Sequence, residues 1–229
     1  DAQNKGQLLG EGLASLKEKF KGAPEFGLPL QSQLLTTVTR GMRLKKLYVR
    51  SSASGGGKSR TALADFCNIS VPWFYDIYEQ NWKYTGLSEP ALFISTELEM
   101  DELQTIALAY VSGVTEDHIL DGRYEEGEEE RINKAIEYIN AAPLFIEFLP
   151  NFSIMDIENL IKKYRRSNGV RYICFDYIHM SAKLIAELGT MTKGMKQLRE
   201  DQVLFLFIDR LKNLCNTEDV FILTMTQLN

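Results

Sequence analysis

The chain has 229 residues, 45% of them hydrophobic and 25% charged, a balance that fits one large α/β domain or at most two small ones. Its formal net charge of −5 gives no global sign of a nucleic-acid partner, which would have to meet a local basic patch. No apolar run approaches the length of a membrane span, and three widely spaced cysteines in apolar segments favour reduced core thiols. We therefore expect a cytoplasmic protein with no membrane partner.

The first 26 residues predict a polar, glycine-rich lead-in and a short amphipathic linker helix over 13–20. The domain itself is expected over residues 27–229, where apolar segments alternate with helical ones. Strands are predicted at 46–51, 89–96, 143–149, 171–180 and 219–229. Helices are predicted from about 59 into the 60s and at 100–113, 125–142, 153–169 and 202–216.

This alternation predicts an α/β fold, a mostly parallel sheet with helices on both faces. Ligands of such sheets bind at the carboxyl ends of the strands, so we look for chemistry just after each predicted strand. We expect the aromatic side chains of segment 70–88 to pack together, and we assign this segment no function. Because the sequence ends where its last strand finishes, we expect the chain to be a piece of a longer protein.

A glycine-rich stretch, SASGGGKS, follows the first predicted strand. Consecutive glycines offer bare backbone N–H groups, a lysine reaches terminal phosphates, a serine hydroxyl suits Mg²⁺, and the following helix adds the positive end of its dipole. A flexible turn that happens to precede Lys-Ser is the plainer alternative. We predict a phosphate-binding loop formed by Ser54, Gly55, Gly56, Gly57, Lys58, Ser59 and Arg60.

Acidic residues follow two of the later strands. Glu97, expected beside the glycine-loop strand, is placed to polarise a water that attacks a γ-phosphate. Glu99 competes for that role, but we expect it to begin the next helix. Asp176 ends a very apolar strand, and its burial needs a cation, which a Mg²⁺ held with Ser59 would supply. His179 is assigned no chemistry beyond a polar relay.

A glutamine, Gln227, follows the last strand and could donate a hydrogen bond to the γ-phosphate. The four strand-end signals, in this order, resemble the C-terminal ATPase domain of bacterial and phage replicative hexameric helicases of the DnaB type, which has a RecA-like fold. The resemblance runs from about Gly27 to the end of the chain. It is carried by TRGMRLKKLYVRSSASGGGKS, FISTELEMDEL, PLFIEFLPNFSIMDIENLIKKYRRSNGVRYICFDYIHM and FILTMTQLN.

The resemblance implies ATP and Mg²⁺ as cofactors and a role for each residue of the site. It assigns phosphate and metal binding to Lys58 and Ser59, catalytic activation of water to Glu97 and metal support to Asp176. Gln227 would couple the nucleotide to DNA-contacting loops. The resemblance also implies a homohexameric ring around single-stranded DNA, with ATP between neighbours and a primase and helicase loader as further partners.

The stretch 181–200 is basic and spaced by glycines, so we expect a mobile loop that faces the centre of the ring. An ordinary solvated loop is the open alternative. The acidic region 116–130 would repel DNA and is expected to face away from it. The predicted DNA contacts are Lys183, Lys193, Lys196 and Arg199.

The chain departs from the family pattern in several places. Ser52, Ala53 and Ser54 stand where the family commonly has Ala, Arg and Pro, and His179 stands where glutamine is usual. The arginine finger would lie beyond Asn229, so we expect this chain to bind nucleotide but hydrolyse it poorly. Two other functions stay open: a recombinase ATPase of the same fold that forms filaments, and a non-unwinding ATP-binding helicase loader or scaffold.

Overall fold

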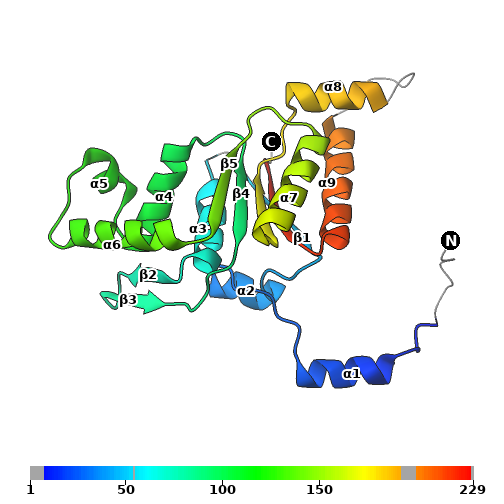
Figure 1. Cartoon of the computed structure of the whole chain (residues 1–229), viewed down its shortest axis with the longest axis horizontal. Helices are drawn as coiled ribbons and strands as arrows, with labels where there is room; N and C mark the ends of the chain where they lie inside the picture. The colour runs from blue at the N-terminus through cyan, green and yellow to red at the C-terminus, as the bar shows by residue number, and fades with distance from the viewer. Residues whose placement is uncertain (1–7, 54, 192–199, 228–229) are drawn as a thin grey trace.

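The computed structural model describes residues 8–53, 55–191 and 200–227 (Figure 1). Their centre is a sheet whose strands lie in the order β1-β7-β6-β4-β5, with every neighbouring pair parallel. This confirms the predicted α/β fold class. The strands are β1 (Leu47–Ser52), β4 (Ala91–Ser95), β5 (Leu144–Phe148), β6 (Tyr172–Asp176) and β7 (Phe221–Gln227).

Helices cover both faces of this sheet, as its two-sided burial requires. Phe93 of β4 belongs to one buried cluster, whereas its neighbours Leu92 and Ile94 belong to the other, so the strand contacts helices above and below. The first cluster lies under α3 (Lys58–Ser70), α4 (Met100–Ser112) and α6 (Glu128–Ala141), and the second under α7 (Ile154–Asn168) and α9 (Glu200–Thr217).

Local sequence signals define the helix ends well. At the start of α7, the Ser153 hydroxyl accepts a hydrogen bond from the Asp156 N–H at 3.0 Å, and the Asp156 carboxylate accepts one from the Ser153 N–H at 3.0 Å. At its end, Gly169 takes the left-handed conformation, with φ of 70°. The helix predicted over 153–169 is therefore confirmed, with Ser153 as its N-cap and Gly169 just past its last residue.

The strand order corrects one expectation. β4, which precedes Glu97, does not lie beside β1, because β7 and β6 fill the two positions between them. β4 pairs instead with β6, and Ser95 lies opposite Asp176. Buried strands of similar apolar composition do not specify their neighbours, so the prediction had no basis for this choice.

The structure of the basic stretch after β6 also differs from the loop that we expected. Residues 182–191 form a helix, α8 (Ala182–Met191), rather than a mobile loop. Leu184 and Leu188, four residues apart, are buried in the second core cluster and hold this helix against the domain. The apolar spacing outweighed the glycine and lysine content that suggested a loop.

A small antiparallel hairpin occupies the aromatic segment 70–88 and is missing from the prediction. It consists of β2 (Trp73–Asp76) and β3 (Asn81–Tyr84). The Trp73 ring stacks on Tyr138 of α6, with centroids 5.8 Å apart. The expected aromatic packing is confirmed, in the form of a hairpin set against α4 and α6.

Three short helices complete the described structure: α1 (Leu13–Gly22), α2 (Gln33–Thr39) and α5 (Glu116–Asp121). α1 stands away from the sheet (Figure 1), and none of its residues is buried. Its apolar side chains Leu13, Leu16 and Phe20 are therefore all exposed to solvent. Within the described residues, no helix is both long enough and apolar enough to cross a membrane.

Candidate functional site

The loop between β1 and α3 exposes bare backbone. Gly55 and Gly57 have φ values of 74° and 70°, which other residues adopt only with strain, and a Cβ atom added at either would meet nothing within 4 Å. Gly57 is the N-cap of α3, and in the described part of the chain no side chain caps that helix. The first N–H groups of α3 are therefore available to an anion.

Lys58 lies at the first position of α3 and folds back over this loop. Its Nζ atom donates hydrogen bonds to the carbonyl oxygens of Ser52, at 3.0 Å, and Ala53, at 3.3 Å. The ammonium group is thus held beside the glycine amides by contacts that are only partly buried. A phosphate could compete for them, because a charge-assisted bond is stronger than a bond to a neutral carbonyl.

Asp176 ends β6 with only 4% of its surface exposed. Burial raises the pKa of this carboxyl group to about 6, the nearby Ser59 hydroxyl opposes the shift, and the nearby charge of Glu97 adds to it. The positive charge of Lys58 opposes the shift as well. The structure therefore brings together Lys58, Ser59, Glu97 and Asp176, which the sequence placed on three separate segments.

Glu97 is the second residue after β4, and its side chain is exposed at the edge of the cavity. Its Oε1 atom accepts a hydrogen bond from the Tyr177 hydroxyl at 2.8 Å. A cavity of about 150 Å³ lies between these groups and the glycine loop. The cavity is lined by Gly55, Gly56, Gly57, Lys58, Ser59, Arg60, Glu97, Leu98, Asp176 and Tyr177.

The competing carboxylate, Glu99, has a structural position. It is the N-cap of α4, and its N–H donates a hydrogen bond to the Glu102 carboxylate at 2.9 Å. Glu99 thus begins the helix, as expected, and does not line the cavity.

The metal-binding groups around Asp176 suit Mg²⁺ better than a metal that is coordinated entirely by protein side chains. Among the described residues, no group of three or more His, Cys, Asp or Glu side chains could hold a metal ion. Mg²⁺ usually takes one or two protein ligands and completes its shell with water and substrate phosphates. A buried carboxylate with a serine hydroxyl beside it, next to open backbone amides, satisfies that requirement.

Arg60 lines the cavity, but its guanidinium is engaged by Glu116 of α5. Both Glu116 oxygens accept from it, each at 2.8 Å. These hydrogen bonds raise the pKa of Arg60 and lower that of Glu116. The pair holds the start of α5 beside α3, a contact that the sequence analysis did not predict.

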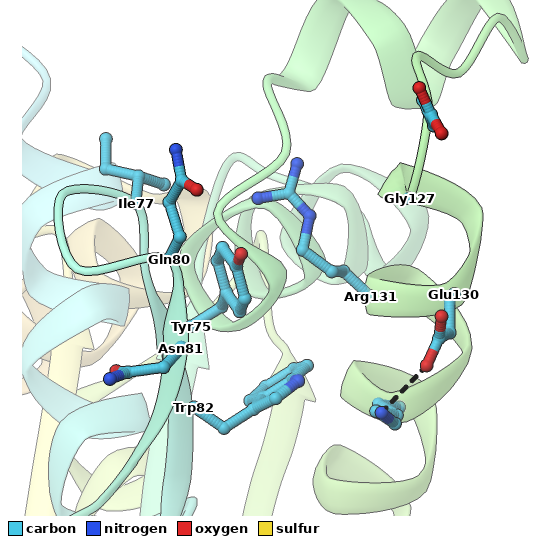
Figure 2. Close-up of a pocket in the computed structure, with 10 residues that line it drawn as sticks. Tyr75, Ile77, Gln80, Asn81, Trp82, Gly127, Glu130 and Arg131 are labelled. Carbon is cyan, nitrogen blue, oxygen red and sulfur yellow. Dashed lines mark hydrogen bonds and ion pairs between the residues drawn. The ribbon is translucent and has the colours of Figure 1, made fainter.

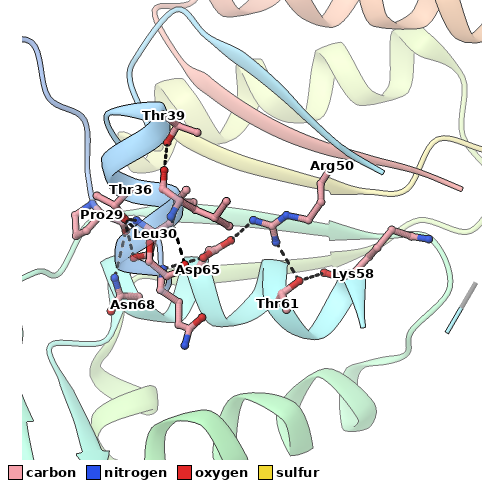
Figure 3. Close-up of polar contacts among 12 residues, drawn as sticks. Pro29, Leu30, Thr36, Thr39, Arg50, Lys58, Thr61, Asp65 and Asn68 are labelled. Carbon is pink, nitrogen blue, oxygen red and sulfur yellow. Dashed lines mark hydrogen bonds and ion pairs between the residues drawn. The ribbon is translucent and has the colours of Figure 1, made fainter. Parts of the chain in front are cut away.

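An ion pair with a buried carboxylate links β1 to α3, the two elements on either side of the glycine loop (Figure 3). Arg50 of β1 donates to the Asp65 carboxylate of α3 at 2.6 Å and to the Thr61 hydroxyl at 3.1 Å. The other Asp65 oxygen accepts from the Gln31 N–H at 2.8 Å. Burial raises the pKa of Asp65, and the charge of Arg50 opposes that shift. The strand before the loop and the helix after it are therefore joined by a charged bond.

Of the remaining predicted site residues, the structure describes Gln227 and Lys183 and not the other four. The Cα of Gln227 pairs with that of Ser52, so β7 ends beside the start of the glycine loop. Lys183 of α8 is half-exposed and pairs with Asp156 at 3.3 Å. The other predicted residues, Ser54, Lys193, Lys196 and Arg199, lie outside the described residues.

His179 lies close to the site but packs as an aromatic residue. Its ring meets Phe152 edge-on at 5.1 Å and lies 5.5 Å from the Tyr177 ring. Its Nδ1 atom is buried and has no hydrogen-bond partner among the described residues. The described contacts therefore include no hydrogen bond at Nδ1 that could form the expected polar relay.

A larger cavity, of about 590 Å³, lies between the β2–β3 hairpin and α6 (Figure 2). Its basic groups are already engaged, because Arg131 lies over the Tyr75 ring at 4.5 Å and Lys134 pairs with Glu130 at 2.9 Å. Glu126 adds negative charge to the wall. Among the described residues that line this cavity, both basic side chains are therefore engaged, whereas phosphate binding needs a free cation.

The glycine loop between a strand and a helix, with an acid at the end of each of two neighbouring strands, defines a P-loop NTPase with a RecA-like fold. Residues 27–229 match the family model described as DnaB-like helicase C terminal domain, and the chain belongs to this family. A solved structure described as an ATPase domain matches with a TM-score of 0.73 and 16% identity, over 98% of this chain and 72% of that one. A DnaB-like replicative helicase, from a structure whose description includes its interactions with primase, matches with a TM-score of 0.74 and 17% identity, over 98% and 49%.

Two curated relatives illustrate the range of the family. An SPbeta prophage-derived uncharacterized protein, YorI, of Bacillus subtilis (strain 168) is 43% identical over 220 residues, which cover 96% of this chain and 43% of that protein. The replicative DNA helicase DnaB of Leifsonia xyli subsp. xyli (strain CTCB07) is 23% identical over 211 residues, 92% of this chain and 41% of the relative. The chain thus spans about two fifths of the length of these relatives.

Proposed function

We propose that this chain is the ATP-dependent motor domain of a replicative DNA helicase, which couples ATP hydrolysis to translocation on single-stranded DNA and to duplex unwinding. One observation carries the proposal: a single cavity gathers the glycine amides, Lys58, Ser59, Glu97 and Asp176 at the carboxyl ends of β1, β4 and β6. Membership of the DnaB-like helicase family supports it.

Each group has a role that its position allows. The amides of Gly55 to Gly57 and the start of α3 bind phosphate oxygens, and the ammonium group of Lys58 leaves the loop carbonyls to bind the terminal phosphates. Ser59 and Asp176 would hold Mg²⁺, which neutralises charge on the phosphates when bound. Glu97 orients and activates the attacking water.

The wider assembly is part of the same proposal. We infer a lead-in and linker over 1–26, an ATPase domain over 27–229, a cytoplasmic location and a ring of six copies around single-stranded DNA. Lys183 and the basic positions of 192–199 would contact the DNA backbone, and Gln227 would relay the state of the nucleotide to them. A primase and a loader are the expected protein partners, since one structural relative is described with a primase.

Strand displacement tests this proposal directly. The natural-length protein, with ATP and Mg²⁺, should separate a forked DNA duplex, and Lys58→Ala should abolish both unwinding and hydrolysis. ATP binding without DNA-stimulated hydrolysis would instead favour a loader or scaffold. Negative-stain images should show closed rings, whereas helical filaments on DNA would favour a recombinase.

A further inference from the structure

Tyr177 contacts the carboxylate to which we assign water activation. It is the first residue after β6, and Glu97 is the second after β4. The two strands pair in parallel with Ser95 opposite Asp176, so their ends lie side by side. The Tyr177 hydroxyl donates a hydrogen bond to Oε1 of Glu97 across this junction, at 2.8 Å. The predictions from sequence assigned Tyr177 no role.

Thr96, the first residue after β4, holds the backbone of Tyr177. Its N–H donates to the Thr96 hydroxyl at 3.1 Å, and the Thr96 N–H donates to the Asp176 carbonyl at 2.8 Å. Thr96 is 4% exposed, so these bonds are shielded from water. The Tyr177 ring also packs against the first core cluster and lies near the His179 ring. A tyrosine fixed in this way has little freedom to move its hydroxyl.

Glu97, in contrast, is a long exposed side chain. A free glutamate populates many rotamers, and only some of them direct its carboxylate to the cavity. Within the described residues, the Tyr177 hydroxyl is the hydrogen-bond partner of this carboxylate. Because the contacts of the described residues engage Oε1 and not Oε2, Oε2 keeps its acceptor capacity for a water molecule.

We propose that Tyr177 is the positioning residue of Glu97, and that its hydroxyl holds the carboxylate at the wall of the phosphate cavity in the orientation that hydrolysis needs. The inference rests on the proposed function of Glu97. The physical reason is orientational: a base held in one geometry has no rotamer search to complete before each turnover.

The test compares steady-state kinetics and nucleotide affinity in the natural-length protein. Tyr177→Phe removes only the hydroxyl and should lower kcat at least about tenfold. KM for ATP, Kd for Mg·ADP and the melting temperature should stay close to the unmodified values, because the ring and the phosphate contacts remain. The matched control is Tyr164→Phe, which removes the hydroxyl bonded to Glu147 at 2.6 Å, away from the cavity, and should leave kcat unchanged.

A double-variant cycle separates positioning from general structural support. Glu97→Gln alone should slow turnover at least about 100-fold. Adding Tyr177→Phe to Glu97→Gln should then change kcat by less than about twofold, because the group that the tyrosine positions is no longer a base. Normal kcat in Tyr177→Phe, a parallel loss of Mg·ADP affinity, or full additivity in the double variant would overturn this inference alone. Normal turnover in Glu97→Gln would overturn the role of Glu97 as well, so the two failures are distinguishable.

Discussion

The Ser59 hydroxyl, at the start of α3, lies beside the buried carboxylate of Asp176 at the end of β6, and both residues line the phosphate cavity. The nearby hydroxyl offsets only part of the cost of burying this carboxylate, since the pKa of Asp176 remains raised to about 6. Keeping this buried carboxylate charged at neutral pH lowers the stability of the folded chain. The carboxylate is well suited to a cation that arrives with a nucleotide.

Asp176→Asn should therefore stabilise the nucleotide-free chain. The folded-state pKa of about 6 exceeds the ordinary value of 3.8, so the charged form is disfavoured in the fold and its cost is fully present above about pH 6. Removing the charge should increase the free energy of unfolding by about 1–3 kcal/mol at pH 7.5. The gain should fade as the pH falls through 6 and be lost near pH 4, as measured by urea unfolding across this range.

The same variant should lose Mg²⁺-dependent nucleotide binding, which calorimetry with Mg·ADP would measure. Asp156→Asn is the matched control, because the pKa of Asp156 is lowered: burial opposes the shift, but the Ser153 N–H and Lys183 outweigh it. That substitution should destabilise the chain above the ordinary pKa and leave nucleotide binding intact. A destabilised Asp176→Asn with normal Mg·ADP affinity would show that Asp176 has a structural role only.

Lys58→Ala should weaken nucleotide binding by at least about tenfold, the scale of one charge-assisted hydrogen bond. Stability should change little, since its bonds to the Ser52 and Ala53 carbonyls are partly exposed. Fluorescence titration with a labelled ADP measures the affinity. Lys212→Ala removes a comparable bond, from Nζ to the Lys45 carbonyl at 2.7 Å, and should not affect it. Equal losses in the two variants would argue against a phosphate role for Lys58.

Gly57→Ala tests whether the open face of the loop is a binding surface. Gly57 and Gly169 both have φ of 70° and open space where a Cβ would lie, so alanine should cost each about 1 kcal/mol of stability. Only the Gly57 substitution adds a methyl group where phosphate would approach, and we expect it to lower Mg·ADP affinity more than about tenfold. Unchanged affinity in Gly57→Ala, measured beside Gly169→Ala, would place the phosphates elsewhere.

Arg50→Met should destabilise the domain by about 2–4 kcal/mol, because it leaves the Asp65 carboxylate, 3% exposed, without its cation. Arg210→Met breaks a pair with Glu158 in which the arginine is 48% exposed, and should cost less than about 1 kcal/mol. Urea unfolding of both variants at pH 7.5 makes the comparison. Similar small costs would mean that water reaches Asp65 once Arg50 is gone.

The sequence alone was enough wherever the chemistry is local. The glycine loop and Lys58 are contiguous, so a strand before them and a helix after them already imply the turn that exposes their backbone. Ser153 and Gly169 likewise mark the ends of α7, because capping involves residues only a few positions apart. The layered parallel sheet was also predictable, because the alternation of apolar strands and helices can be read directly along the chain.

The tertiary structure alone decided which distant groups meet. The buried strands β4 and β6 are apolar except for their last residues, and nothing in such residues specifies which strand will be the neighbour of another. Pairing is settled by the packing of the whole domain, and it set Glu97 beside Tyr177 rather than beside β1. The bond between Arg60 and Glu116 likewise depends on how α5 folds back toward α3, a long-range arrangement that no short stretch of sequence encodes.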